Sequence, residues 1–242
     1  MYQGTALQAA RPRSGAWASF RRMARAALAP YPSAYFFFFR LFAAGKGYNG
    51  ALCRETELVI EGFPRSANSW SVVAFREAQG REVRLAHHRH AEAQVLAAAR
   101  RGLPVVVLVR RPADAIRSLK LRNPEIDQND ALRRWTRFYE AVVKVSDKVV
   151  IATFEQATGD FGKVIDRINA RFACDFARCE ASEEFREHVF AAMERDNADN
   201  PAFAARPSPE RSRALQALAL DLAPQALARA NAFYDRLAAL AN

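Results

Sequence analysis

The chain has 242 residues, of which 50% are apolar and 26% are charged, the composition of an ordinary globular protein. Its formal net charge is +10, but residues 1–54 hold eight Arg or Lys and no acidic residue, so the rest of the chain holds 28 basic against 26 acidic residues. The most apolar run, residues 34–39, ends at Arg40, which excludes a membrane span of about 20 residues there.

The N-terminal stretch, residues 1–50, is predicted to be a basic, Phe-rich arm in front of an α/β domain at 51–242. A basic arm favours an anionic partner, either a membrane surface, a nucleic acid or an acidic glycan, although a solvated tail without a partner explains it equally well. The phenylalanines at 36–39 either touch a bilayer interface or, as is more common, belong to a helix that packs onto its own domain. Peripheral membrane contact through this arm stays open.

The cysteines indicate the compartment. There are three, Cys53, Cys174 and Cys179, and they show no metal-ligand spacing. An odd and sparse set is typical of reduced thiols rather than of a disulfide framework. We therefore expect a cytoplasmic protein.

From residue 57 onward, apolar runs of strand length alternate with helical patterns. Strands are predicted at 58–61, 83–86, 104–109 and 148–153, with helices between them at 69–79, 91–101, 112–122 and 129–146. The C-terminal part is predicted to be helical, at 160–172, 183–196, 209–222 and 225–240. Alternating strands and helices form right-handed βαβ units, so the sequence predicts a three-layer α/β/α fold with a central parallel sheet.

The first strand runs into GFPRSANSW, residues 62–70, and then into a helix. Ligands of parallel sheets bind beyond the carboxyl ends of the strands, and backbone N–H groups at a helix N-terminus bind anions. Arg65 adds a positive charge, and Ser66, Asn68 and Ser69 add polar side chains, which suits a phosphate-sized dianion. The alternative is that these polar residues only cap the helix. The loop is not a Walker A motif, because it has no Gly-Lys pair followed by a hydroxyl residue.

A second polar segment follows the buried strand at 104–109, in the sequence VVVLVRRPADAIRS. Arg110 lies just past the strand, and Ser118 lies eight residues later, about two turns into a helix that Pro112 opens. The forked guanidinium of arginine suits phosphate geometry. Two anion sites at two strand ends predict a ligand with a phosphate-type group at each end.

These two segments resemble the nucleotide-binding motifs of sulfotransferases that use 3′-phosphoadenosine 5′-phosphosulfate (PAPS). GFPRSANSW resembles the 5′-phosphosulfate loop, and RRPADAIRS resembles the 3′-phosphate segment, in the same order and with one strand–helix unit between them. The resemblance covers residues 57–170 well, the C-terminal helices loosely and residues 1–50 not at all. It implies a P-loop-like fold, PAPS as the sulfuryl donor and no metal. It also implies donor-binding residues, namely Arg65, Ser66, Ala67, Asn68, Ser69, Trp70, Arg110 and Ser118.

The chain departs from the family pattern in three places. Ala67 stands where glycine is usual, and Arg65 replaces the lysine of the cytosolic members. The glycine-rich C-terminal nucleotide segment is absent, and ARPSPERSR, residues 205–213, is predicted to replace it through Arg206 or Arg211, unless it is only a solvated helix start.

Aromatic residues are weaker candidates for the nucleotide site. Trp70 and Trp135 could stack on adenine or on a sugar, but tryptophans at such positions are more often core residues. Phe154 stands where the family has a tyrosine beside the adenine, and only a weak contact is expected from it.

Three of the four histidines, His87, His88 and His90, follow the second predicted strand. Sulfuryl transfer to a hydroxyl needs a general base, and histidine titrates near the working pH. Strand register favours His88, with His90 close behind and Glu92 as a further candidate. A zinc site is the alternative, although no acidic or cysteine cluster completes it. His188 is expected to be structural.

The sequence therefore predicts a PAPS-dependent sulfotransferase with Arg65 and His88 as its catalytic residues. The acceptor, a glycan, lipid or small molecule with a hydroxyl or amine group, is not readable. The alternatives are a P-loop nucleotide kinase and a non-catalytic anion- or membrane-binding adaptor. No specific nucleic-acid partner is expected.

Overall fold

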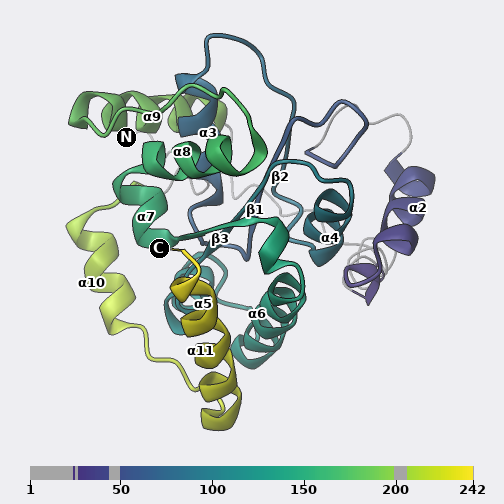
Figure 1. Ribbon diagram of the computed structural model, residues 1–242. Coiled ribbons are helices and arrows are strands. Elements are labelled where there is room, and N and C mark those ends of the chain that lie inside the picture. Colours follow the sequence, from purple (N-terminus) through teal and green to yellow (C-terminus); the bar gives the residue numbers. More distant parts are fainter. Residues whose placement is uncertain (1–23, 25–26, 44–49, 199–205, 242) are drawn as a thin grey trace, which may run out of the picture.

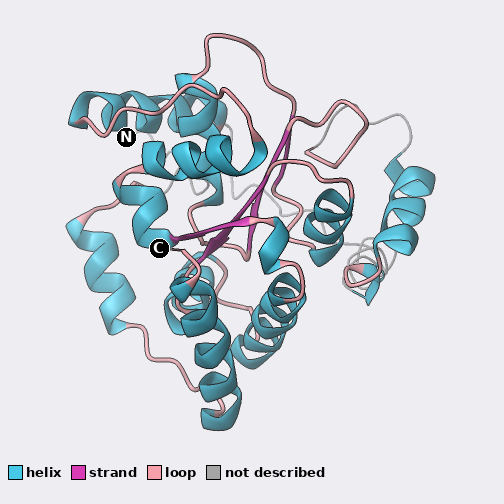
Figure 2. Ribbon diagram, in the orientation of Figure 1, coloured by secondary structure: helices cyan, strands magenta, loops and turns pink. Residues whose placement is uncertain are grey.

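The computed structural model describes residues 24, 27–43, 50–198 and 206–241. Its centre is a four-stranded sheet in the order β2-β1-β3-β4, and every neighbouring pair is parallel. The strands are β1 (Leu58–Gly62), β2 (Leu85–His87), β3 (Val105–Val109) and β4 (Val150–Thr153). Helices cover both faces, as Figure 2 shows, so the predicted three-layer α/β/α architecture is confirmed.

Each face of the sheet has its own core, because side chains of a strand alternate between faces. Leu58 and Ile60 pack with α3 (Asn68–Ala78), α8 (Phe161–Phe172) and α9 (Glu183–Asp196), and the short α7 (Phe154–Gly159) contributes Ala157. Val59 and the opposite face of β3 pack with α4 (Glu92–Arg100), α5 (Pro112–Arg122), α6 (Gln128–Val143) and α11 (Pro224–Ala239). In Figure 1 the first group lies above the sheet and to its left, and the second lies to its right and below it.

The two central strands lie unusually close where β1 ends. A Cβ on Gly62 would lie 2.4 Å from the carbonyl oxygen of Leu108, so only glycine fits at this position. The next residues of the chain form the loop 63–67, which therefore leaves the sheet directly beside the carboxyl end of β3.

The described part of the N-terminal stretch is a helix, α2 (Pro32–Ala43), beside α4 (Figure 1). Tyr35 is fully buried there with Ala91 and Ala93, and Ala93 N–H donates to the carbonyl of Ala29 at 2.7 Å. Phe37 stays 65% exposed. The part of the predicted basic arm at residues 1–23 lies outside the described residues. Within the described part of the chain no helix is long and apolar enough to cross a bilayer.

The largest differences between the predicted and the observed elements occur in three places. The predicted strand at 83–86 is observed at 85–87, because Arg84 N–H donates to the Glu57 side chain before the ladder begins. The predicted helix 209–222 ends early, as α10 (Pro209–Ala217). The segment after it is extended because its carbonyls accept side-chain donors from α5 and α6, as Leu218 does from Arg117. Finally, the strand predicted at 148–153 is observed at 150–153, and α7, which was not predicted, follows it at once. Thr153 and Gln156 form a capping box at the start of α7.

Candidate active site

The strand order creates a switch point between β1 and β3. From β1 the chain moves to β2 on one side, and from β2 it crosses to β3 on the other side. The crevice between the carboxyl ends of β1 and β3 is where ligands of such sheets bind. A cavity of about 380 Å³ lies there, with the loop after β1 and Arg110 after β3 on its walls. This volume falls in the usual range of about 300–1,000 Å³ for small-molecule sites.

The loop after β1 has a backbone suited to binding an anion. Arg65 and Ala67 have positive φ angles of 72° and 70°, with Ser66 between them. Left-handed residues next to right-handed ones turn successive N–H groups into a concave nest for anions. The loop then enters α3, whose first turn has no side-chain cap: the Asn68 amide donates instead to the carbonyl of Phe63 at 3.0 Å. The capping alternative for these polar residues is therefore not what the structure shows.

Tyr139 of α6 holds this loop in place through hydrogen bonds of its hydroxyl group. Its buried hydroxyl donates to the carbonyl of Leu108 at 2.6 Å and accepts from the N–H of Phe63 at 3.1 Å. The hydroxyl of Ser66 lies 3.4 Å away. Burial raises the pKa of Tyr139, so it stays a neutral phenol. One side chain thus ties the loop to the end of β3.

Guanidinium groups converge on Ser118, which is buried in α5. The hydroxyl oxygen of Ser118 accepts from Nε of Arg65 at 3.0 Å and from Nη2 of Arg211 at 3.3 Å. Arg110 donates from Nη1 to the carbonyl of Arg65 at 3.0 Å, and its guanidinium lies 4.0 Å from the ring centre of Phe154. The structure therefore brings the two predicted anion-binding segments into one cavity.

The cavity is strongly cationic. Five arginines line it: Arg65, Arg110, Arg122, Arg186 and Arg211. Among the described residues that line it, none is an aspartate or a glutamate. Burial, and then the charges of the neighbouring arginines, lowers the pKa of Arg65 to about 10. Cations held close together without a counter-charge repel one another, and a bound polyanion would relieve that repulsion.

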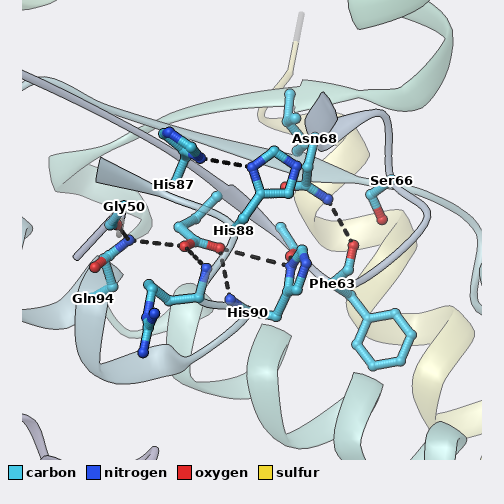
Figure 3. A network of polar contacts seen from close by, with 12 residues as sticks. Gly50, Phe63, Ser66, Asn68, His87, His88, His90 and Gln94 are labelled. Atoms are coloured by element: carbon cyan, nitrogen blue, oxygen red, sulfur yellow. Dashed lines mark hydrogen bonds and ion pairs between the residues drawn. The ribbon is translucent and has the colours of Figure 1, made fainter. Parts of the chain in front are cut away.

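The histidines lie at the β2 end of the same cavity (Figure 3). His88 and His90 line it, whereas His87 does not. Nδ1 of His88 is 2.7 Å from Nδ1 of His87, and Nε2 of His88 is 3.0 Å from the Ser69 hydroxyl. Burial, and then the charges of nearby arginines, lowers the pKa of His88 to about 4. His90 instead donates from Nδ1 to the carbonyl of Gly62 at 2.7 Å.

The other predicted base, Glu92, does not reach the cavity, and the described residues do not form the metal site that was the alternative for the histidines. Glu92 is buried, and it pairs with Arg137 at 2.8 Å on the side of α6. No group of three or more His, Cys, Asp or Glu that could hold a metal ion occurs within the described ranges. His188 forms an ion pair with Glu77 of α3 and is not among the residues that line the cavity.

Apolar side chains form the other wall, under α9. Trp70 lies with its ring centre 4.9 Å from that of Phe190, and its indole N–H donates to the carbonyl of Ala157. Phe154 and Met193 line the same wall. Trp135, the second tryptophan named from the sequence, is fully buried in the core below the sheet.

The C-terminal segment reaches the cavity through one of its two candidate arginines. Arg211 lines the cavity, whereas Arg206 pairs with Glu187 and Glu194 on the surface of α9. The structure therefore does not bring Arg206 to the cavity. Sequence reasoning missed Arg122, although it stands one helical turn after Ser118 on α5, a spacing that places both on one face. It also missed Arg186, because no local pattern shows that α9 folds back over the cavity.

No protein-family model and no curated protein matches this sequence. Among solved structures, the fold is similar to that of mouse sulfotransferase SULT7A1 complexed with PAP, at 16% identity and a TM-score of 0.41. That match covers 77% of this chain and 84% of the mouse chain. A likeness this distant leaves the function to be inferred from the cavity itself.

Proposed function

We propose that this protein is a sulfotransferase that moves a sulfuryl group from PAPS to a hydroxyl or amine group of an acceptor. The observation that carries the proposal is the convergence of Arg65 and Arg211 on Ser118, with Arg110 bound to the carbonyl of Arg65, at the switch point of the sheet. Because no carboxylate lies on the described lining, the cavity is complementary to a ligand with two phosphate-type groups.

Each part of the cavity has a role in this reaction. The N–H groups of loop 63–67 and the guanidinium of Arg65 bind the 5′-phosphate end of the donor. Arg110, Ser118 and Arg211 hold the 3′-phosphate. Trp70 and Phe154 offer the flat apolar surfaces that an adenine needs.

The chemical step requires one bond to form and one to break. The acceptor oxygen or nitrogen bonds to sulfur, and its proton passes to a histidine ring. His88 and His90 are the candidates, because both line the cavity. The bond from sulfur to the 5′-phosphate oxygen breaks, and that oxygen keeps the electron pair. Arg65 and the loop N–H groups stabilise the charge that develops there, and in many enzymes such electrostatic stabilisation contributes more to the rate than any other effect.

The test is a thermal shift with 3′-phosphoadenosine 5′-phosphate (PAP), the bisphosphate that remains after transfer. At a hundredfold excess over Kd, PAP should raise the Tm of the wild type by about 5–10 °C. Arg110→Ala removes charge-assisted hydrogen bonds to the 3′-phosphate and should weaken PAP binding by about tenfold to a hundredfold. Arg133→Ala, an exposed arginine on the outer face of α6 that pairs with Asp130, is the matched control and should respond as the wild type does.

Two results would contradict the proposal. One is strong stabilisation by ATP with magnesium and none by PAP, which would favour a nucleotide kinase. The other is an equal response to PAP in the wild type and in Arg110→Ala, which would place the bisphosphate elsewhere on the protein.

A further inference from the structure

A fully buried carboxylate stands behind the histidine loop. Glu61 is the fourth residue of β1, in an otherwise apolar strand, and its side chain is 0% exposed. One oxygen, Oε1, accepts from Arg89 N–H at 2.7 Å and from the Gln94 amide at 2.9 Å. The other, Oε2, accepts from His90 N–H at 3.0 Å and lies 3.9 Å from Nδ1 of the His90 ring. In Figure 3, dashed lines mark the hydrogen bonds that Gln94 and His90 make in this network.

The groups that face Glu61 are all donors, which explains why a carboxylate rather than an amide occupies this position. A carboxylate accepts on both oxygens, whereas a glutamine would place an N–H₂ group against a backbone N–H. Gln94 is itself fixed, since its amide also donates to the carbonyl of Gly50 and its oxygen accepts from Leu52 N–H. The carboxylate therefore joins β1, the segment at 50–52, and α4 to the loop that carries the histidines.

The loop needs this support because its backbone is unusual. His88 and His90 have φ angles of 56° and 49°, a conformation that residues other than glycine adopt rarely. The two N–H groups bound by Glu61 belong to Arg89 and His90, so the carboxylate holds the turn at its centre. That turn brings Nδ1 of His90 to the carbonyl of Gly62.

The bond to Gly62 decides which ring nitrogen of His90 can take a proton. A carbonyl oxygen only accepts, so Nδ1 carries the hydrogen and, in the neutral ring, Nε2 carries the lone pair. His88 has no such bond to a carbonyl, and both of its nitrogens lie against His87 and Ser69. A ring whose pKa is lowered to about 4 is also a weak base.

We propose that Glu61 is a positioning residue for His90: it holds the turn of residues 88–90, keeps Nδ1 on Gly62 and so presents Nε2 as the proton acceptor. The inference rests on the proposed sulfuryl transfer for its chemistry. Above about pH 7, where Glu61 is ionised, its carboxylate also provides a negative charge 3.9 Å from Nδ1 of His90 when that ring accepts a proton. Among the described residues, His88 lies 5.8 Å from His90 between ring centres, and the arginines that line the same cavity oppose a positive charge on the His90 ring.

The test uses Glu61→Gln, which keeps the size of the side chain, removes the charge and loses one of the two hydrogen bonds to the loop backbone. Without the anion, the pKa of His90 should fall by about one unit in the ligand-free protein, measured by NMR titration of the ring. Turnover should fall by about tenfold to a hundredfold, part of the 10²–10⁴-fold that a general base contributes. PAP binding should stay within about twofold of wild type, because Glu61 does not line the cavity. Glu57→Gln is the matched control, since Glu57 also accepts a backbone N–H, from Arg84, at the far end of the same strand.

A double-mutant cycle shows whether Glu61 acts through His90. The variant with both Glu61→Gln and His90→Gln should be no slower than His90→Gln alone, because the carboxylate has no base left to position. The proposal would be overturned if the loss of turnover in the double variant equalled the product of the losses in the two single variants. An unchanged pKa of His90 in Glu61→Gln would also overturn it. If the wild type transfers no sulfuryl group, the proposed function fails, while the titration still decides whether Glu61 controls His90.

A second measurement covers the case in which Glu61→Gln does not fold. In the wild type, ¹⁵N shifts of the neutral His90 ring should show hydrogen on Nδ1, and hydrogen on Nε2 would overturn the proposal. Glu61→Asp keeps the charge but withdraws it by one methylene, so its turnover should fall while the pKa of His90 changes by less than in a charge-free variant.

Discussion

Ala67 has a left-handed backbone at the point where the loop meets α3, with φ 70° and ψ 17°. A side chain with a Cβ costs about 1–2 kcal/mol in this conformation, whereas glycine adopts it freely. The sequence already marked this position as one where glycine is usual among PAPS-dependent sulfotransferases, and the structure supplies the reason. The chain therefore carries strain in the loop that we propose binds the 5′-phosphate.

Replacing Ala67 with glycine should relieve that strain. We expect Ala67→Gly to raise the free energy of unfolding by about 1 kcal/mol and the Tm by about 2–4 °C. Ala97→Gly is the control, because Ala97 lies inside α4, where glycine should instead destabilise by about 0.5–1 kcal/mol. Chemical denaturation of the three proteins gives the comparison. If Ala67→Gly melts below wild type, the left-handed conformation is not a source of strain.

At the scale of elements, α6 reaches under the sheet to fix the anion-binding loop. Tyr139 connects α6, the end of β3 and the loop after β1 through one hydroxyl group. The sequence could predict α6 as a helix, since it places Trp135, Phe138 and Tyr139 on its buried face. It could not predict that the hydroxyl of Tyr139 reaches the strand end, because that depends on how the helix crosses the sheet.

Removing this hydroxyl should affect both stability and ligand binding. Tyr139→Phe leaves the N–H of Phe63 buried without its acceptor, which we expect to cost about 1–3 kcal/mol of unfolding free energy. PAP should also bind more weakly, because loop 63–67 loses its anchor. Tyr234→Phe is the control: this buried tyrosine of α11 lies against Arg111, away from the loop. An equal loss in both variants, in urea denaturation and in PAP titration, would contradict the role of Tyr139.

At the scale of the whole molecule, buried titratable groups make the unfolding free energy depend on pH. Two sets of groups act in opposite directions. Burial raises the pKa of Glu61 to about 7, although hydrogen bonds from its neighbours counteract this. Because the pKa of Glu61 is higher in the folded than in the unfolded protein, its contribution to the unfolding free energy is fully present below about pH 4.5. That contribution is lost as pH rises from about 4.5 to 7. Burial, and then like charges, lowers the pKa of both His87 and His88 to about 4. Their contribution is present above about 6.5 and is lost as pH falls toward 4.

The difference between two variants isolates the Glu61 contribution. Relative to wild type, Glu61→Gln should gain about 3 kcal/mol of unfolding free energy as pH rises from 4.5 to 7.5, because glutamine has no proton to lose. The measurement is a series of urea midpoints for both proteins across this range. Contributions of groups that Glu61 does not contact are present in both proteins and cancel. A difference that stays constant with pH would show that Glu61 is ionised throughout.

The sequence predicted most of the fold because strands and helices leave local patterns. The run VVVLV could only be a strand covered on both faces, and Pro112 marked the start of α5. The sequence also indicated the residues after β1 and β3, since strand ends of parallel sheets meet at one edge. It did not reveal that Arg65 would touch Ser118, nor that Glu61 supports the loop after β2. Both contacts depend on the order of the strands in the sheet, and the local sequence patterns do not show which strands pair.

The arginine-lined cavity has a practical consequence at the bench. Five guanidiniums in a cavity whose described lining includes no Asp or Glu should attract any small dianion, so inorganic phosphate or sulfate in a purification buffer would compete with the nucleotide. Melting temperatures recorded in phosphate would then exceed those in a chloride-only buffer, and donor affinities would look weaker than they are. The choice of buffer anion is therefore itself a variable in every experiment on this protein.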